Sequence, residues 1–396
     1  MRSILIGLGV IAAYYALIFG YAARVRAERH EHVAWRFPLR GGSDYCADPM
    51  PNGACVCSDA GTLLIVKDGK ELARFKAFES NPELGDYSPF EGYQWIGGTR
   101  DSLALVSAAR PPMNDLSLYA IECSGKVRWQ THIPPGEVVT WIECSPDAIF
   151  VLTYELTSSS QRSMPVSRIH RYGLDGKQIY SVEPKISVGQ LAVADDNWAY
   201  LADNTGKTIE ARNPEGKLIW QTLSGGSIPI YSSYGDGKTL FYVDNSSKLH
   251  GVGRDGKELF ATQLPAQSYP TPGFVDTLRM ALNSGNANYM PNYNVCNLAD
   301  GGGRIYNTSG TLLTCIDTAG KQLWQSTLRS SPLAIAADSK GRAYITLSSG
   351  GICCYSPDGK ELWRNSSMSH FSSALSVGSD DRVLVEADGE LICIKH

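Results

Sequence analysis

The sequence predicts an all-β fold, an eight-bladed β-propeller preceded by one N-terminal hydrophobic helix. Two observations carry this prediction: a short turn pattern recurs eight times along the 396 residues, and apolar runs of strand length surround each copy. Hydrophobic residues make up 43% of the chain, enough for a large core. Because the net charge is −4, the chain lacks the basic balance that adhesion to nucleic acid requires, and we expect no nucleic-acid partner.

The first predicted element is a membrane segment. Residues Ile4 to Ala23 carry no charge, and a helix of this length spans the hydrocarbon core of a bilayer, about 30 Å. A cleavable signal peptide usually has a shorter apolar region of ~7–15 residues, so an uncleaved anchor is favoured. We therefore assign residues 1–32 to an N-terminal transmembrane anchor or signal segment.

Charges around this segment leave the side of the membrane open. Arg2 precedes it, whereas Arg24, Arg26 and Arg29 follow it. Counted by the positive-inside rule, these arginines favour a cytoplasmic body. The family resemblance described below favours export instead.

Ten cysteines are present, and several lie inside strand-like runs, where Cys acts as a small buried hydrophobe. An oxidising compartment would permit a disulfide from Cys46 to either Cys55 or Cys57. Connectivity does not follow from sequence alone, so both alternatives stay open.

The repeated pattern is a Gly, usually after an acidic residue and before Lys, with an aromatic residue a few positions later. Each copy predicts a tight hairpin whose Gly takes positive φ, and an outer strand whose aromatic packs between neighbouring sheets. We therefore expect the Gly and Trp residues of the best copies to have a structural, packing role. They are Gly216, Gly320 and Gly359, with Trp129, Trp220, Trp324 and Trp363. The eight glycines of the pattern are at 69, 125, 176, 216, 256, 320, 359 and 389.

The two ends of the body complement each other. The last unit offers three strands and lacks a fourth, and Val33–Leu39 resembles the outer strand of other units. An outer strand supplied from the N-terminus removes exposed sheet edges, so residues 33–396 are predicted to form one closed propeller. Seven blades are the alternative, because the first unit is short and its innermost strand is poorly defined.

These repeats resemble the PQQ-like, quinoprotein-type eight-bladed propellers, whose repeat ends in a Gly-Lys turn followed by Trp. The best matches are Asn213–Trp220, Asp317–Trp324 and Ser356–Trp363. The family includes dehydrogenases and non-catalytic scaffolds such as the outer-membrane assembly lipoprotein, and fold alone does not decide between them. The resemblance implies a body on the extracytoplasmic side, periplasmic or at the cell surface.

A quinoprotein oxidoreductase using PQQ and Ca²⁺ is one alternative function. The dehydrogenases of this family carry a disulfide between adjacent cysteines, and this chain has one adjacent pair, Cys353–Cys354. However, the pair lies in a strand-like run, where adjacent side chains point to opposite faces. No other motif of the catalytic set can be placed, so we expect no catalytic, cofactor or metal residue and favour a non-enzyme without a cofactor.

Enlarged loops predict a protein-binding surface. The first-to-second unit link, and the loops between second and third strands of the second and third units, should emerge on one face. Tolerated surface insertions are the plain alternative. The candidate partner-binding residues are Glu83, Asp86, Tyr87, Arg110, Met113, Asp115, Gln161 and Arg162.

An Asn-rich segment, Asn283–Gly303, is predicted between the first and second strands of the sixth unit, on the opposite face. Its amides and tyrosines suggest a second alternative function, carbohydrate or small-ligand binding through Tyr289, Asn292 and Tyr293. The favoured function remains a membrane-anchored propeller that binds other proteins as a scaffold.

Overall fold

The computed structural model describes fourteen stretches of the chain, and every regular element in them is a β-strand. None of these stretches contains a helix that could cross a membrane. The predicted hydrophobic helix falls on residues 1–30, outside the described residues. The described stretches are 31–39, 48–50, 52–59, 62–75, 92–98, 103–110, 115–155, 166–203, 207–223, 230–232, 238–244, 246–265, 297–368 and 371–395.

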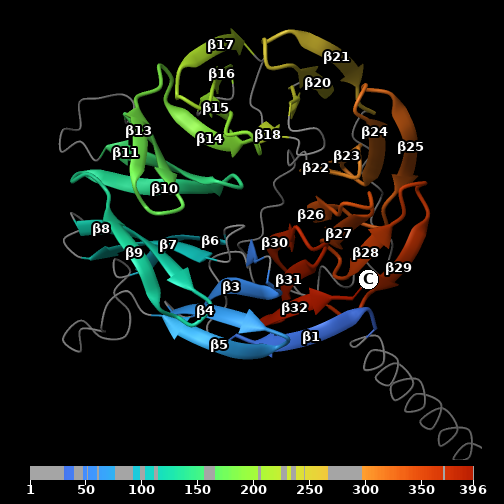
Figure 1. The fold of residues 1–396 in the computed structure, drawn as a ribbon. Coiled ribbons are helices and arrows are strands. Elements are labelled where there is room, and N and C mark those ends of the chain that lie inside the picture. The colour runs from blue at the N-terminus through green and yellow to red at the C-terminus, as the bar shows by residue number, and fades with distance from the viewer. Residues whose placement is uncertain are drawn as a thin grey trace, which may run out of the picture.

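The strands form eight four-stranded antiparallel sheets arranged in a ring, as Figure 1 shows. Within each sheet the first strand lies nearest the centre of the ring and the fourth lies at the rim. The prediction of an all-β propeller is therefore confirmed.

The first four sheets follow one another along the chain, each made of four consecutive strands. They are β2 (Asp48–Pro49), β3 (Ala54–Asp59), β4 (Thr62–Lys67) and β5 (Lys70–Phe75); β6 (Gly92–Gly98), β7 (Leu103–Arg110), β8 (Asp115–Glu122) and β9 (Val127–His132); β10 (Glu137–Cys144), β11 (Ala148–Glu155), β12 (Ser167–Gly173) and β13 (Gln178–Val182); and β14 (Val188–Val193), β15 (Ala199–Asp203), β16 (Thr208–Arg212) and β17 (Leu218–Leu223).

The next three sheets continue in the same way, and the eighth, the closing sheet, combines both ends of the chain. They are β18 (Ile230–Ser232), β19 (Leu240–Val243), β20 (Lys248–Val252) and β21 (Glu258–Gln263); β22 (Asn297–Gly301), β23 (Arg304–Ser309), β24 (Leu312–Asp317) and β25 (Gln322–Thr327); β26 (Pro332–Ala337), β27 (Ala343–Leu347), β28 (Ile352–Tyr355) and β29 (Glu361–Asn365); and β30 (Phe371–Val377), β31 (Val383–Ala387), β32 (Glu390–Ile394) and β1 (Val33–Pro38).

In the closing sheet, β1 pairs antiparallel with β32, which is the pairing expected from the missing outer strand of the last unit. An ion pair between Arg36 and Glu390, with 2.6 Å between the charged atoms, supports this ladder. Because the strand from the N-terminal side completes the sheet from the C-terminal end, neither end of the chain leaves an unpaired strand here. The seven-blade alternative rested on a poorly defined innermost strand in the first unit. In the structure this strand is the two-residue β2.

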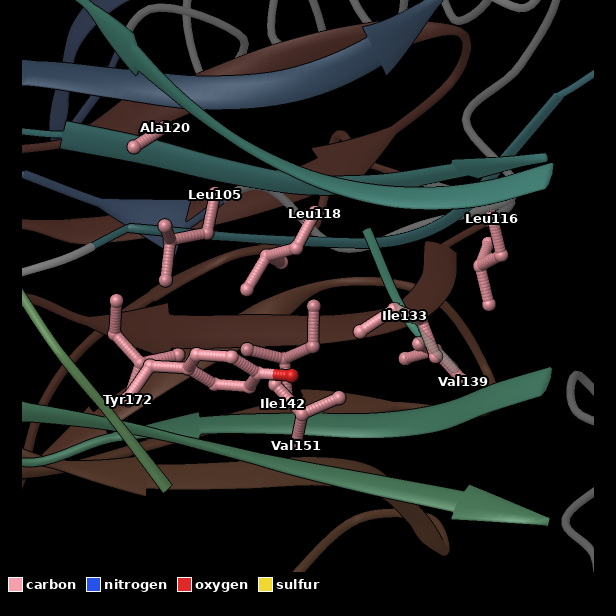
Figure 2. Packing of buried hydrophobic residues seen from close by; sticks show 10 residues of the cluster. Leu105, Leu116, Leu118, Ala120, Ile133, Val139, Ile142, Val151 and Tyr172 are labelled. Carbon is pink, nitrogen blue, oxygen red and sulfur yellow. The ribbon is translucent and has the colours of Figure 1, made fainter. Parts of the chain in front are cut away.

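Apolar side chains fill the spaces between neighbouring sheets. Figure 2 shows the core between the second and third sheets, where Leu105 and Leu118 face Ile142, Val151 and Tyr172. Each fully buried Leu or Ile of this kind contributes roughly 1.5–3 kcal/mol to the free energy of unfolding. These cores hold each sheet against its neighbours around the ring.

The repeated turn joins each sheet to the next at the rim. The indole of Trp129 on β9 donates a hydrogen bond of 2.8 Å to the carbonyl of Leu174, in the β12–β13 turn of the next sheet. Gly176 of that turn has φ +78°, and a Cβ there would lie 2.6 Å from the indole. Glycine is therefore needed both for its conformation and for the close approach. The same indole-to-turn bond joins Trp220 to Arg254 (3.0 Å) and Trp324 to Pro357 (2.8 Å).

Other aromatic residues take the place of Trp at equivalent turns. The ring of Tyr180 lies 3.0 Å from the Cβ position of Gly216, and that of Phe260 lies 2.3 Å from the Cβ position of Gly320. Gly359 packs on Trp324 in the same way, with 2.8 Å between the Cβ position and the ring.

The closing sheet has no continuous turn at this position, because its third and fourth strands come from opposite ends of the chain. His32 takes the place of the turn: its ring stacks on Trp363 with 4.4 Å between centroids. The eighth sequence copy, around Asp388 and Gly389, lies instead between β31 and β32, the second and third strands. Its assignment as a turn before an outer strand is thus wrong.

Candidate functional site

The ring has two faces that differ in their connections. One face carries the turns between first and second strands and the turns between third and fourth strands; we call it the short-turn face. The other, the long-connection face, carries the turns between second and third strands and the links from one sheet to the next. Since the strands are antiparallel and follow one another radially, these two groups of connections must lie at opposite ends of the strands.

Connection lengths separate the two faces. On the short-turn face the longest connection is the seven residues between Ser232 and Leu240, 233–239. On the long-connection face, 16 residues (76–91) join β5 to β6, 11 residues (156–166) join β11 to β12, and 33 residues (264–296) join β21 to β22. Every connection longer than nine residues therefore starts and ends on one face.

The candidate partner-binding residues belong to this long-connection face by connectivity. Arg110 and Asp115 pair with each other at the ends of β7 and β8, where the chain turns between second and third strands. The remaining candidates lie in segments outside the described residues, and their role stays a prediction: Glu83, Asp86, Tyr87, Met113, Gln161 and Arg162.

The predicted position of the Asn-rich segment is wrong. The sequence analysis placed it between first and second strands, but β22 begins at Asn297 and turns into β23 through Gly302 and Gly303 alone. Both glycines have positive φ, +56° and +72°, which is typical of a two-residue hairpin turn. Residues 283–296 therefore belong to the connection that leads into the first strand on the long-connection face, and residues 297–303 form that strand and its turn. The segment's candidate ligand residues Tyr289, Asn292 and Tyr293 lie outside the described residues.

A buried polar cluster lies at the long-connection end of the third sheet. The Glu137 carboxylate, on the first residue of β10, accepts a hydrogen bond from the Thr153 hydroxyl at 2.5 Å and lies 2.7 Å from His170 Nε2. Arg168 Nε lies 3.4 Å from the other carboxylate oxygen, and its Nη2 lies 3.5 Å from Glu183. These contacts join the ends of β10, β11 and β12 where the 156–166 connection begins and ends.

The geometry of this cluster indicates a structural role. Burial raises the pKa of Glu137, but hydrogen bonds from His170 and Thr153 lower it by more, so the net pKa lies below its usual value. The Thr153 hydroxyl and the Glu137 carboxylate both face the same imidazole nitrogen, 3.1 Å and 2.7 Å away. In a nucleophile–histidine–acid triad they would occupy different nitrogens. The carboxylate is thus a common acceptor, and the hydroxyl is not positioned as a nucleophile.

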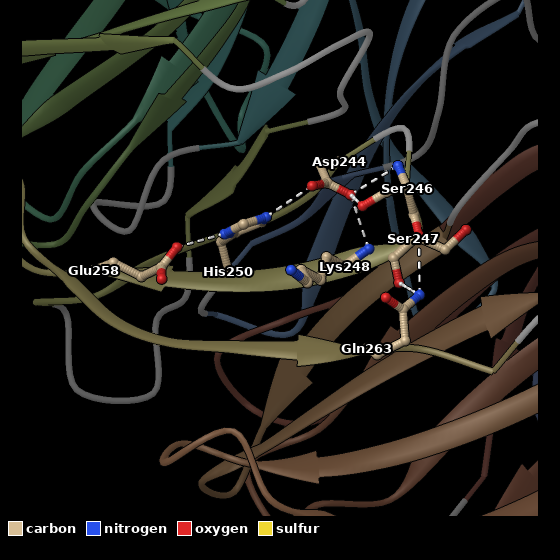
Figure 3. A network of polar contacts seen from close by, with 7 residues as sticks. All are labelled: Asp244, Ser246, Ser247, Lys248, His250, Glu258 and Gln263. Atoms are coloured by element: carbon tan, nitrogen blue, oxygen red, sulfur yellow. Dashed lines mark hydrogen bonds and ion pairs between the residues drawn. The ribbon is translucent and has the colours of Figure 1, made fainter.

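A second polar cluster, drawn in Figure 3, follows β19 on the same face. Asp244 accepts hydrogen bonds from the Ser246 hydroxyl (2.7 Å) and from the Lys248 backbone (2.9 Å). The His250 ring bridges two carboxylates, with Nε2 3.0 Å from Asp244 and Nδ1 2.8 Å from Glu258. Burial raises the pKa of Asp244, yet the hydrogen bonds from Ser246 and His250 lower it overall. This cluster fixes the turn between β19 and β20.

The adjacent cysteines lie in two different cores. Cys353 packs between its own sheet and the preceding one, and Cys354 packs toward the closing sheet, so the two side chains point to opposite faces of β28. Burial raises the pKa of each thiol to about 12.

Cysteines recur at equivalent positions 39 residues apart, at 315, 354 and 393, always buried on a third strand. Within the described residues, no group of His, Cys, Asp or Glu side chains has the arrangement to hold a metal ion.

Neither polar cluster was anticipated from the sequence. Glu137, Thr153 and His170 are separated by up to 33 residues and belong to three strands, so no local motif joins them. Asp244 and His250 are close enough in sequence to be noticed, because an Asp that ends one strand often hydrogen-bonds the turn that follows.

The fold and its repeated turns define a β-propeller with PQQ-like repeats. A family model described as outer membrane protein assembly factor BamB matches residues 308–395, so the resemblance inferred from the turns is shown over this part of the chain. A search of curated proteins finds no match.

Solved structures share the architecture. BamB from Moraxella catarrhalis has 13% sequence identity and a TM-score of 0.57, with 90% of this chain and 98% of that chain covered. The C-terminal WD40 domain of Sif2 has 10% identity and a TM-score of 0.58, with 92% and 99% covered. At these identities the similarity shows the fold alone.

Proposed function

We propose that this chain is a membrane-tethered β-propeller, its eight sheets being eight blades, that binds other proteins as a non-catalytic scaffold on the extracytoplasmic side. The observation that carries the proposal is the segregation of every long connection to one face of the ring. Rigid sheets that present variable connections on one side are suited to recognition. The family match supports the same class, since it is described as an assembly factor of the outer membrane.

The proposed binding surface comprises the connections at 76–91, 111–114, 156–166 and 264–296. The polar clusters around Glu137 and Asp244 lie at strand ends of the long-connection face. They hold in place strand ends from which connections on this face leave. The tether is the apolar segment Ile4–Ala23.

Crosslinking of the full-length protein in its native membranes, followed by mass spectrometry, tests this function. We expect one dominant partner crosslinked to the second and third sheets. Replacing Thr157–Pro165, or Pro111–Asn114, with the two residues Asn-Gly should abolish those crosslinks without lowering the thermal midpoint, because a two-residue turn can still join paired strand ends such as Arg110 and Asp115. A matched control, Lys177→Glu on the short-turn face, should leave them unchanged. Crosslinks that persist in both replacement variants would show that the surface is elsewhere.

A further inference from the structure

His250, on the third strand of the fifth sheet, lies between two carboxylates, as Figure 3 shows. Its Nε2 is 3.0 Å from Asp244 Oδ2, and its Nδ1 is 2.8 Å from Glu258 Oε2. Asp244 follows β19 and Glu258 begins β21, so the two acids come from the strands on either side of β20. Within the described stretches, these two are the charged side chains that face the imidazole.

The surroundings of the ring are otherwise aromatic. Tyr242 of β19 stacks on His250 with 4.7 Å between centroids and 16° between the planes. Tyr242 belongs to the core shared with the fourth sheet, where Trp198, Tyr200 and Trp220 pack. Burial raises the pKa of Tyr242 to about 12, so its phenol stays neutral beside the imidazole.

The two carboxylate contacts of His250 require two protons on its ring. Ionised carboxylates accept hydrogen bonds and do not donate them, so each contact needs an N–H from the imidazole. A neutral imidazole has one N–H, whereas the imidazolium has two. Burial raises the pKa of Asp244, but hydrogen bonds from Ser246 and His250 lower it overall, which keeps this acid ionised. Both bonds therefore form together only when His250 carries its second proton.

A second histidine at the same position of the repeat provides a contrast. His170 and His250 each lie six residues before the glycine of the repeated turn, Gly176 and Gly256. His170 Nε2 faces Glu137 at 2.7 Å, but its Nδ1 is buried and has no hydrogen-bond partner among the described residues. A neutral ring with its proton on Nε2 satisfies this site, since a second proton would leave a buried N–H without an acceptor.

We propose that His250 is a proton-dependent latch that ties the outer strand β21 to the β19–β20 turn. Asp244 is the fixed side, because its other oxygen already accepts bonds from Ser246 and from the Lys248 backbone. Glu258 is the side that is released, because its side chain is 53% exposed and water can replace the imidazole as donor. When Nδ1 gives its proton to solvent, the bond to Glu258 is lost and the bond to Asp244 remains.

The latch acts on the strand from which the longest connection leaves. β21 is the last strand of its sheet and is hydrogen-bonded to β20 on one side only. Its end is tied to the same turn, because the Gln263 side chain donates to the Ser246 carbonyl and the Leu264 backbone donates to that of Ser247, both at 2.9 Å. Protonation of His250 adds a second attachment for this strand. The inference does not depend on the scaffold or the tether of the proposed function.

Nuclear magnetic resonance of the full chain in detergent micelles, with nitrogen-15 in the histidine rings, tests the protonation state. Proton–nitrogen correlation spectra distinguish the imidazolium from the two neutral tautomers, and His250→Gln and His170→Gln assign the signals. From about pH 5.5 to about pH 8.5, where histidine ordinarily changes its charge, we expect His250 to pass from the imidazolium to the Nε2–H form. A neutral ring with its proton on Nδ1, or a His250 signal that is the same at both ends of this range, overturns the latch.

Glu258→Gln sharpens the same experiment. An amide stabilises the imidazolium less than a carboxylate does, so His250 should lose its second proton at a lower pH in this variant. Glu361→Gln is the matched control, because Glu361 also lies two residues after a turn glycine but bonds Arg364 in another sheet. It should leave the His250 titration unchanged. Identical titration in Glu258→Gln and in the unaltered chain contradicts the proposal.

A double-mutant cycle measures the attachment of the strand itself. His250→Gln, Glu258→Gln and the double variant are unfolded in urea, each in the full chain. At about pH 5.5 we expect the two substitutions to depart from independence by about fivefold in the unfolding equilibrium constant, and at about pH 8.5 by less than about twofold. Equal coupling at both pH values, or stronger coupling at the higher one, shows that the contact does not depend on the proton and overturns the latch.

Discussion

Among the described residues, polar contacts between neighbouring sheets are more numerous on the short-turn face than on the long-connection face, where the Val188 backbone donates to the Ser167 hydroxyl at 2.9 Å. On the short-turn face, contacts pass from one sheet to the next: Ser145 donates to Asn197 at 2.6 Å, Ser339 donates to Asp381 at 2.8 Å, and Tyr306 donates to the carbonyl of Gly341 at 2.5 Å. On the long-connection face, the clusters around Glu137 and Asp244 bond strands and turns of a single sheet.

This difference shows how the ring can be both closed and variable. Contacts between sheets fix the angle from one sheet to the next, so the turns that make them cannot lengthen without disturbing their neighbours. A cluster within one sheet holds its strand ends whatever the connection between them contains. We therefore expect the short-turn face to contribute more to the stability of the ring, and the long connections lie on the other face.

The largest expected effect comes from comparing two glycines with similar φ, one on each face. Gly176 (φ +78°) packs on Trp129, whereas Gly136 (φ +85°) has no atom within 4 Å of its Cβ position. Ala at either position adds strain of about 1 kcal/mol. At Gly176 the indole must also move, so we expect Gly176→Ala to lower the free energy of unfolding by about 3 kcal/mol in total. Urea denaturation of both variants measures the difference.

Equal losses for these two variants would contradict the larger contribution to stability expected from the short-turn face. Gly389→Ala provides a further control, since Gly389 (φ +73°) is equally open and lies on the long-connection face. It should resemble Gly136→Ala.

The next largest effect is expected at Glu137. Glu137→Gln replaces the charged acceptor shared by Thr153 and buried His170 with a neutral, weaker amide oxygen, so we expect a loss of about 2 kcal/mol. Glu71→Gln is the matched control, because its partner Arg74 is on a partly exposed surface and such pairs contribute about 0.5 kcal/mol. A loss at Glu137 no larger than at Glu71 would show that the cluster does not hold the strand ends.

The same cluster predicts a pH dependence. The folded-state pKa of Glu137 is lowered, so its contribution is fully present above the usual Glu pKa and is lost as pH falls through the lowered value. The pKa of Asp244 is also lowered, so its contribution to the free energy of unfolding is likewise lost at acid pH. Urea midpoints measured from pH 7 to pH 3 should therefore fall on the acid side, and less steeply in Glu137→Gln than in the unaltered chain.

The repeats made the fold predictable because each copy encodes a contact between neighbouring sheets. Gly176 and Trp129 must occur where they do, since the turn of one sheet packs on the aromatic of the sheet before it. The outer strand at Val33–Pro38 was recognisable for the same reason: its Trp35 packs on Gly69, 3.1 Å from the Cβ position. Because each pair of neighbouring sheets needs this contact, the pattern recurs along the chain and can be recognised in the sequence.

Other features lack such a constraint. The Asn-rich segment was assigned to the wrong connection because its length hid the two-residue turn at Gly302 and Gly303. The cluster at Glu137 was missed because its members meet only after β10, β11 and β12 are paired. Residues that satisfy one another within one sheet leave no periodic signal.

The smallest effect compares the same substitution on the two faces. Ser339→Ala removes a hydroxyl bond between two sheets, and Ser246→Ala removes one within a single turn. The Asp244 carboxylate keeps the backbone donors of Ser246 and Lys248 and the contact with His250, so we expect the second change to cost only about 0.5 kcal/mol. Loss of the Ser339 hydroxyl leaves one bond from this residue to Asp381, and we expect about 1 kcal/mol. Differential scanning calorimetry resolves the two, and a larger loss for Ser246→Ala would place the more important polar contacts on the long-connection face.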